Sequence, residues 1–238
     1  MKKTFLTICF LLFSGCVNTI DQASLEDPLE SINRYTHTFN KSIDKSLLRP
    51  SAKIYGNSVP TNLRVLLSNF SSNLAEPLQF ANHILQGDLI DGSTSALRFG
   101  INSTVGLGGL LDVASYLKLF GEETTLDETL RAWQIPTGPY VELPFFGPSS
   151  VRGTIAKFVE LTTDPIAASV NRGYKLAYYS TVGADLLNTR YEFNDTIDDI
   201  LYKSFDSYGT NKSYYFQTLG PISSEALDND LLEIYMQD

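Results

Sequence analysis

Cys16 is the residue whose type and setting most clearly indicate chemistry. It closes the string LLFSGC (residues 11–16), which follows Lys2 and Lys3. A basic start, a short apolar core and small residues at a cut site are typical of a secretory leader. A cysteine directly after the small pair is typical of a bacterial lipobox, in which the thiol is acylated. We therefore predict a leader over residues 1–15 and lipidation of Cys16; the alternative is an ordinary leader with a chance cysteine.

Groups that could support catalysis or bind a metal are few. The chain has two histidines, His37 and His83, and each falls in a helical pattern where a hydrogen-bonded residue on the helix surface is the simpler interpretation. It has no G-x-S-x-G nucleophile motif and no His/Glu spacing typical of zinc. The glycines at 106, 108 and 109 lack the pattern of a phosphate-binding loop and indicate a tight turn between helices. We predict no enzyme activity, no metal and no cofactor; a lipid hydrolase that uses the histidines is the enzyme alternative.

The charge balance argues against some classes of binding partner. The net charge is −9, and loss of Lys2 and Lys3 with the leader makes it −11. Phosphate binding needs clustered basic side chains, so this balance argues against nucleic acid. Cys9 lies in the leader and Cys16 is the lipid site, so we expect no disulfide. After the leader, no apolar run reaches the length of a membrane-spanning helix.

Apolar residues recur every three or four positions along most of the chain, and period-two alternation is nearly absent. This pattern predicts an all-α fold: a tether over 16–26, a helical domain over 27–210 and a polar, acidic tail over 211–238. We expect Pro50 to end the first helix and Pro77 to break the second. The predicted helices cover 27–48, 60–75, 78–86, 93–101, 125–133, 151–159, 172–190 and 195–206.

One segment breaks the helical pattern. Residues 135–148 hold four prolines and two glycines among aromatic side chains. Such a segment cannot form a regular helix and is typical of a rigid apolar hairpin with glycine pivots. The candidate residues of this hairpin are Gly138, Pro139, Tyr140, Leu143, Pro144, Phe145, Phe146 and Gly147. From these patterns alone, two alternatives stay open: a bundle whose apolar faces form a core, or a body that lies in a membrane.

The order of several motifs resembles one family. The first is D-P-L-E-x-x-N-R followed by F-N, which holds Asp27, Pro28, Asn33, Arg34, Phe39 and Asn40. Others are N-L-x-E-P (73–77), R-F-x-x-N-S-T-x-G-x-G-G-L-x-D-V-A (98–114) and G-P-Y-x-x-L-P-x-x-G-P-S-S-x-R (138–152). This arrangement is similar to the MlaA (VacJ) outer-membrane lipoproteins over about residues 27–165. The chain departs from the family at Gly153, where the family usually has Asp, and the likeness fades beyond about residue 190.

The resemblance implies a ring-like bundle of amphipathic helices, embedded in one leaflet of the outer membrane on its periplasmic side and anchored through Cys16. It implies an amphipathic channel, removal of mislocalised phospholipids from the outer leaflet, and transfer to the periplasmic carrier MlaC. It also implies association with trimeric porins. The alternative function is an envelope lipoprotein that scaffolds porins without transporting lipid.

Two sets of residues are the candidates for this role. Arg98, Asn102, Ser103 and Thr104 could line the channel, with Arg98 meeting the lipid phosphate; ordinary capping and turn hydrogen bonds are the equal alternative. The hairpin of residues 138–147 could gate the channel about its glycine pivots. The alternative for the hairpin is a static cap on the bundle.

Overall fold

The computed structural model describes residues 27–171, 173 and 175–219. The predicted leader, the tether, Cys16 and residues 220–238 lie outside this described part. Its helices are α3 (Glu30–Ile43), the π-helix η1 (Asp44–Leu48), α4 (Arg49–Ser58), α5 (Thr61–Gln86), α6 (Leu89–Thr104), α7 (Val113–Tyr116), α8 (Leu126–Ala132), α9 (Val151–Thr163), α10 (Pro165–Ser169), α11 (Lys175–Glu192), α12 (Asn194–Asp198), the π-helix η3 (Asp199–Lys203) and α13 (Ser207–Thr218).

The prediction of an all-α fold with a short hairpin is confirmed. The hairpin consists of β1 (Tyr140–Leu143) and β2 (Gly147–Ser150), which pair antiparallel with Tyr140 opposite Ser150 and Leu143 opposite Gly147. Its turn places Phe145 at φ +68° and Gly147 at φ +74°. Positive φ suits glycine and strains phenylalanine, so the tip is a tight turn rather than an open loop.

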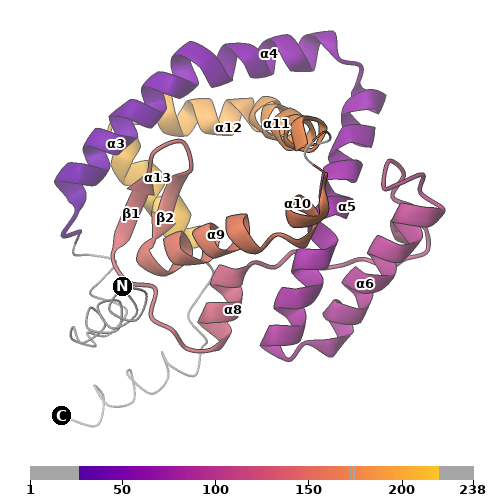
Figure 1. The fold of residues 1–238 in the computed structure, drawn as a ribbon. Helices are drawn as coiled ribbons and strands as arrows, with labels where there is room; N and C mark the ends of the chain where they lie inside the picture. Colours follow the sequence, from indigo (N-terminus) through magenta and orange to yellow (C-terminus); the bar gives the residue numbers. More distant parts are fainter. Residues whose placement is uncertain (1–26, 172, 174, 220–238) are drawn as a thin grey trace.

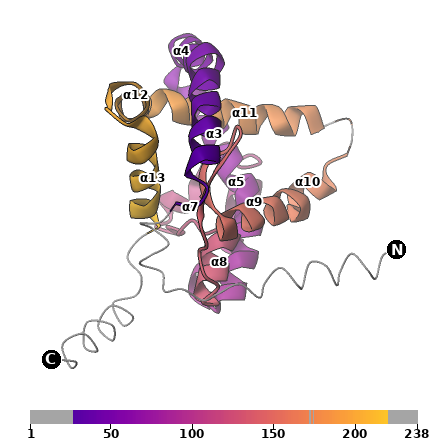
Figure 2. The same cartoon turned by 90° about the vertical axis from the view of Figure 1, so that its left-hand side faces the viewer.

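The elements close into a ring (Figure 1). Starting from α3, η1 and α4, the contacts pass from α4 to α11, from α11 to α5, from α5 to α8, and from α8 to α9. Helix α9 packs on both strands, and β1 packs back on α3, which closes the circle. Figure 2 shows α12 and α13 on one side of α3 and α10 on the other. Segments from both ends of the described chain, α3 and α13, therefore meet at the hairpin, where α3 packs on β1 and α13 packs on β2.

Two prolines do not end helices as predicted. Pro77 lies inside α5, which continues without a break to Gln86. Proline removes only its own N–H bond, to the carbonyl four residues earlier, and the long packed helix tolerates that loss. Pro50 lies in the first turn of α4, directly after η1, so its missing N–H falls where the hydrogen-bond register already changes.

The prediction of a tail from residue 211 is wrong for its first part. Helix α13 runs through Asn211 to Thr218, and Tyr208 in its first turn is buried. The reason is tertiary: Tyr140 packs its ring 5.9 Å from the ring of Tyr208 and 5.8 Å from that of Tyr215. Aromatic packing against the hairpin thus orders a segment that looks polar in sequence.

Burial in this ring is inverted relative to a water-soluble domain. Among the described residues, five apolar side chains are buried, and three of them are alanines, against nineteen polar or charged ones. Large apolar side chains are exposed instead, with Ile90 and Leu176 each 80% exposed. None of the described helices is long and apolar enough to cross a membrane. Polar groups therefore hold the interior together, and the exterior carries the apolar surface.

Candidate functional site

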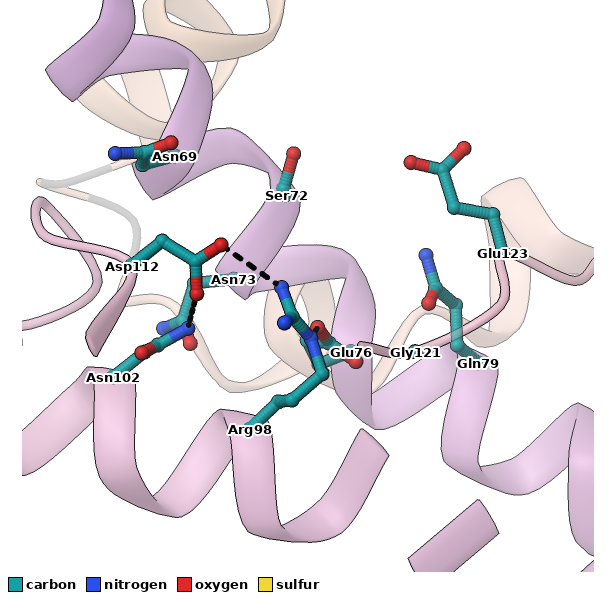
Figure 3. Close-up of a pocket in the computed structure, with 10 residues that line it drawn as sticks. All are labelled: Asn69, Ser72, Asn73, Glu76, Gln79, Arg98, Asn102, Asp112, Gly121 and Glu123. Carbon is teal, nitrogen blue, oxygen red and sulfur yellow. Dashed lines mark hydrogen bonds and ion pairs between the residues drawn. The ribbon is translucent and has the colours of Figure 1, made fainter. Parts of the chain in front are cut away.

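A polar pocket lies between α5 and α6, closed by the segment that leads into α7 and by residues 121–123 (Figure 3). It encloses about 110 Å³. Polar residues recur at spacings of three and four along α5, so that helix presents one hydrophilic stripe to α6. The lining residues are Asn69, Ser72, Asn73, Glu76, Gln79, Arg98, Asn102, Asp112, Gly121 and Glu123.

Arg98 is the central cation of this pocket, and four of its five N–H donors have protein partners. Its Nε donates to Glu76 at 2.6 Å, and one terminal nitrogen donates to the carbonyl of Leu119 at 2.7 Å. The same nitrogen donates to Ser115 at 3.1 Å, and the other reaches Asp112 at 3.4 Å. Such a guanidinium joins α5, α6 and α7 into one unit.

The two carboxylates around Arg98 differ. Burial raises the pKa of Glu76 and outweighs the opposing effect of Arg98, and its second oxygen is buried with no hydrogen-bond partner in the described chain. Burial also opposes ionisation of Asp112, but hydrogen bonds from Ser115 and Asn102 prevail and lower its pKa. The surroundings of Arg98 therefore move the pKa values of these two carboxylates in opposite directions.

Three of the four predicted channel-lining residues come together here. Arg98 and Asn102 line the pocket, and Ser103 accepts from Asn73 Nδ2 at 3.0 Å just beside it. Asn102 also receives the backbone N–H of Ala114 at 2.9 Å, which is the turn-capping role weighed above. Thr104 is apart from them: it is exposed, and its hydroxyl donates to the Gly100 carbonyl at 2.7 Å.

Sequence reasoning missed the part of the pocket that α5 supplies. Asn73 and Glu76 were noted only as motif residues. The signal that could have found them was the presence of Asn69, Asn73 and Glu76 on one face of an otherwise apolar helix. The prediction of a turn between helices at the glycines is confirmed, since the segment joins α6 to α7. It also packs closely on α5: a Cβ on Gly109 would lie 2.5 Å from Nδ2 of Asn73.

A second polar arrangement closes the ring where α3 meets β1. Asn33 donates to the Tyr140 carbonyl and accepts from the Glu142 N–H, both at 2.9 Å. Asn40, seven residues later on the same face, donates to the Leu143 carbonyl at 3.0 Å and accepts from the Phe145 N–H at 2.8 Å. Two side-chain amides thus pair with the free edge of β1 as a neighbouring strand would. We call this contact the α3–β1 seam.

His37 lies between these amides and was wrongly assigned to the helix surface: it is 4% exposed. Its Nδ1 lies 3.0 Å from a Glu142 oxygen, and its Nε2 lies 2.9 Å from the Ser207 hydroxyl. Neither partner is near in sequence, which is why no pattern indicated them. A serine, a histidine and a carboxylate in this order have the contacts of a hydrolase triad, although Lys41 also donates to Ser207 at 3.2 Å.

The remaining residues of the first motif join α3 to α13. Asp27 accepts from Asn33 at 3.2 Å, bonds the Tyr208 hydroxyl and pairs with Lys212 at 3.2 Å. Arg34 donates to both oxygens of Asp206 at 2.9 Å. Outside this network, the exposed Pro28 precedes α3, and the ring of Phe39 lies 5.2 Å from that of Phe145.

The predicted hairpin residues divide into a buried base and an exposed tip. Tyr140 is fully buried, Leu143 is half-buried, and the Pro139 carbonyl accepts from Val151 N–H at 3.1 Å. A Cβ on Gly138 would meet Val151 at 3.1 Å, so this pivot is closely packed. At the tip, Pro144, Phe145 and Phe146 are exposed next to the half-buried Gly147.

The family model described as "MlaA lipoprotein" matches residues 25–220. The chain belongs to this family. It is 31% identical to the "Intermembrane phospholipid transport system lipoprotein MlaA" of Shigella flexneri, over 91% of this chain and 86% of the relative. The same description, identity and shares apply to the relative from Escherichia coli K12. An uncharacterised protein of Rickettsia bellii is 30% identical, over 86% of this chain and 80% of its own length.

A solved structure shares the fold. It was reported as "Structural basis for maintenance of bacterial outer membrane lipid asymmetry" and is similar with a TM-score of 0.70 and 34% sequence identity. The match covers 81% of this chain and 96% of the other. The ring is therefore a fold of this family, and its pocket and seam are the places where this chain can be compared with its relatives.

Proposed function

We propose that this chain is an outer-membrane lipoprotein that removes mislocalised phospholipids from the outer leaflet and passes them to a periplasmic carrier, MlaC in the family. The observation that carries this proposal is the inverted ring, with charged groups inside and apolar groups outside. The names of its relatives, which are lipoproteins of an intermembrane phospholipid transport system, support it. No bond needs to be made or broken for this function.

The apolar exterior supports placement in a single leaflet on the periplasmic side of the membrane. Exposed apolar groups of this number would aggregate in water, whereas lipid tails would cover them. Helices too short or too polar to span a bilayer can lie within one leaflet with their apolar faces in the acyl region. In this arrangement, acyl chains on Cys16 add to an attachment that the ring already provides.

A lipid head group passing the hydrocarbon needs polar partners on its path, since an unpaired polar group in an apolar medium costs several kcal/mol. The polar pocket offers such partners. Because four of the five N–H donors of Arg98 already have protein partners, we assign it a positioning role rather than direct phosphate binding. Ser72, Gln79 and Glu123 are then the groups in the pocket available to a head group.

We restrict the proposed gate to one part of the hairpin. Asn33 holds the base of the hairpin, and Asn40 holds the backbone at Leu143 and Phe145, which argues for a static backbone. The exposed side chains of Phe145 and Phe146 at the tip are the part we propose as the gate. The test of the whole function is a strain that lacks the gene: complementation with this chain should clear phospholipids from the outer leaflet. Porin association without such clearance would favour the scaffold alternative.

One observation favours a second function. The contacts of Ser207, His37 and Glu142 could support ester hydrolysis, in which Ser207 would be the nucleophile. Ser207→Ala separates the two functions better than a histidine variant, because His37 also holds the seam. Under lipid transport, Ser207→Ala keeps full clearance and purified protein releases no fatty acid from phospholipid vesicles. Fatty-acid release that Ser207→Ala abolishes would establish the hydrolase instead.

A further inference from the structure

A cluster at the α5–α6 turn lies outside both arrangements described above. It contains His83 in the last turn of α5, Asp88 at the start of α6 and Asp91 in its first turn. One potential ligand atom from each side chain lies within 4.8 Å of the other two. The turn itself is well defined: Gly87 adopts φ +81°, and the Asp88 N–H donates to the His83 carbonyl at 2.9 Å. These three side chains therefore face one another from a fixed backbone.

The hydrogen bond of His83 sets its tautomer. Its Nε2 lies 3.0 Å from the backbone carbonyl oxygen of Glu122. A carbonyl oxygen only accepts, so Nε2 carries the proton and Nδ1 of the neutral ring keeps a lone pair. Nδ1 is buried and has no hydrogen-bond partner in the described chain, and the side chain is 4% exposed. Metal-binding histidines are commonly oriented in this way, with the other ring nitrogen donating to a carbonyl.

The two aspartates add oxygen ligands. One oxygen of Asp88 accepts the N–H groups of Ile90 and Asp91, which leaves its other oxygen available. The two carboxylates carry like charges and offer their ligand atoms close together, so a cation between them would offset their repulsion.

We propose that His83, Asp88 and Asp91 bind a divalent transition-metal cation, for which Zn²⁺ is the best fit. Zn²⁺ takes one imidazole nitrogen with carboxylate oxygens, whereas Ca²⁺ and Mg²⁺ prefer oxygen ligands alone. At metal–ligand distances of about 2.0–2.2 Å, tetrahedral ligand atoms lie roughly 3.4 Å apart. The ligand atoms lie within 4.8 Å of one another, so the half-buried aspartates reach that spacing by closing by up to about 1.4 Å. Solvent supplies the fourth position.

Such an ion would link elements that also form the polar pocket. It would join the end of α5 to the start of α6, and through His83 to the carbonyl of Glu122. The residues on either side, Gly121 and Glu123, line the pocket. The ion would therefore fix one wall of the pocket. Its binding does not depend on the transport function and is measured separately.

The test is Zn²⁺ binding by tag-free, full-length protein in detergent after chelator treatment. Competition with a chromogenic chelator should show one Zn²⁺ per chain, unaffected by excess Mg²⁺ or Ca²⁺. His83→Gln keeps an amide donor for Glu122 and removes Nδ1; Asp88→Asn with Asp91→Asn removes both carboxylates. Each should weaken binding at least about 100-fold, the upper end of what loss of an outer-shell contact costs. Co²⁺ should give the visible absorption of a low-coordinate N/O site.

The matched control is Asp195→Asn with Asp199→Asn, which makes the same charge change on the exposed face of α12 and η3. This control should bind Zn²⁺ as tightly as the unmodified chain. The proposal is overturned if the unmodified chain shows no saturable one-to-one binding of Zn²⁺. It is also overturned if the His83→Gln variant binds Zn²⁺ as tightly as the unmodified chain. Equal weakening in the control variant would also overturn it, since that would show general charge attraction only.

Discussion

Asn33 and Tyr140 are joined by a hydrogen bond of 2.9 Å between groups that are 107 residues apart in sequence. The same amide accepts from the Glu142 N–H, so one buried side chain satisfies two backbone groups of β1. A strand edge would otherwise expose these groups. The ring is thus closed by a side chain rather than by a third strand.

Removing this amide should open the seam. Asn33→Ala leaves a buried carbonyl and a buried N–H unpaired, which we expect to lower the free energy of unfolding by about 2–4 kcal/mol. Denaturant unfolding in detergent, followed by circular dichroism, measures the loss. Thr38→Ala is the control, because Thr38 is exposed and bonds only its own helix; its effect should stay within about 0.5 kcal/mol. Similar losses in both variants would contradict the assigned role.

Arg98 and Glu76 should be coupled. Arg98→Met leaves the buried Glu76 without its cation, and breaking a buried pair costs about 3–5 kcal/mol. Adding Glu76→Gln should recover part of that loss, because the neutral amide no longer needs a cation. A double-mutant cycle on unfolding free energies gives the coupling. Additive losses would show that the two groups act independently.

Arg34 and Asp206 should make stability fall in acid. Hydrogen bonds from Arg34 lower the pKa of Asp206 to about 2, below the usual value near 4. The folded form holds the proton less tightly than the unfolded form, so the contribution is complete above about pH 4 and is lost as pH falls towards 2. The pair is half-exposed, so the effect is small. Asp206→Asn should reduce the difference in the free energy of unfolding between pH 5 and pH 2.5. If the difference is unchanged, the loss of stability in acid comes from other carboxylates.

Locking the hairpin tip should stop transport. Residues 27–219 contain no cysteine, so introduced pairs can be oxidised without side reactions. Phe39→Cys with Phe145→Cys joins the tip to α3, where the two rings already lie 5.2 Å apart. Oxidation should block clearance of outer-leaflet phospholipid, and reduction should restore it. Val141→Cys with Ser149→Cys, which face each other across the strands, is the control and should transport in both states. Transport by the oxidised tip variant would assign the tip a static role.

The ring should bind membranes without its acyl chains. Cys16→Ser removes the lipid, and the exposed apolar exterior should still carry the mature protein to phospholipid vesicles. Flotation with vesicles measures this partition. A protein that stays monomeric and unbound in the aqueous fraction would show that lipidation provides the whole attachment.

Sequence patterns predicted the helices and the hairpin because these depend on local periodicity and on proline and glycine. They failed where distant partners decide the outcome. Pro77 looks like a helix end, but α5 packs on α6, α11 and α8, and this packing keeps the helix whole. His37 looks like a surface residue because Glu142 and Ser207 are far away in sequence.

Sequence patterns predicted only part of the candidate site, because the other part depends on residues that are distant in sequence. Arg98 and Asn102 belong to one continuous motif and were found together. Asn73 and Glu76 reach the pocket from another helix, and only the pairing of α5 with α6 shows it. Amphipathic periodicity alone also left open which face points outward. The buried charges decide that the polar faces point inward.

The inverted burial has a consequence for the heat capacity of this molecule. Exposure of apolar surface raises the heat capacity on unfolding, by about 12–15 cal/mol/K per residue in an ordinary domain, while exposure of polar surface lowers it. Here unfolding uncovers mainly polar groups, since the apolar side chains are already outside. The stability curve should therefore be unusually flat with temperature. In the proposed placement, the bilayer around the ring, rather than an internal core, would supply the apolar contribution to its stability.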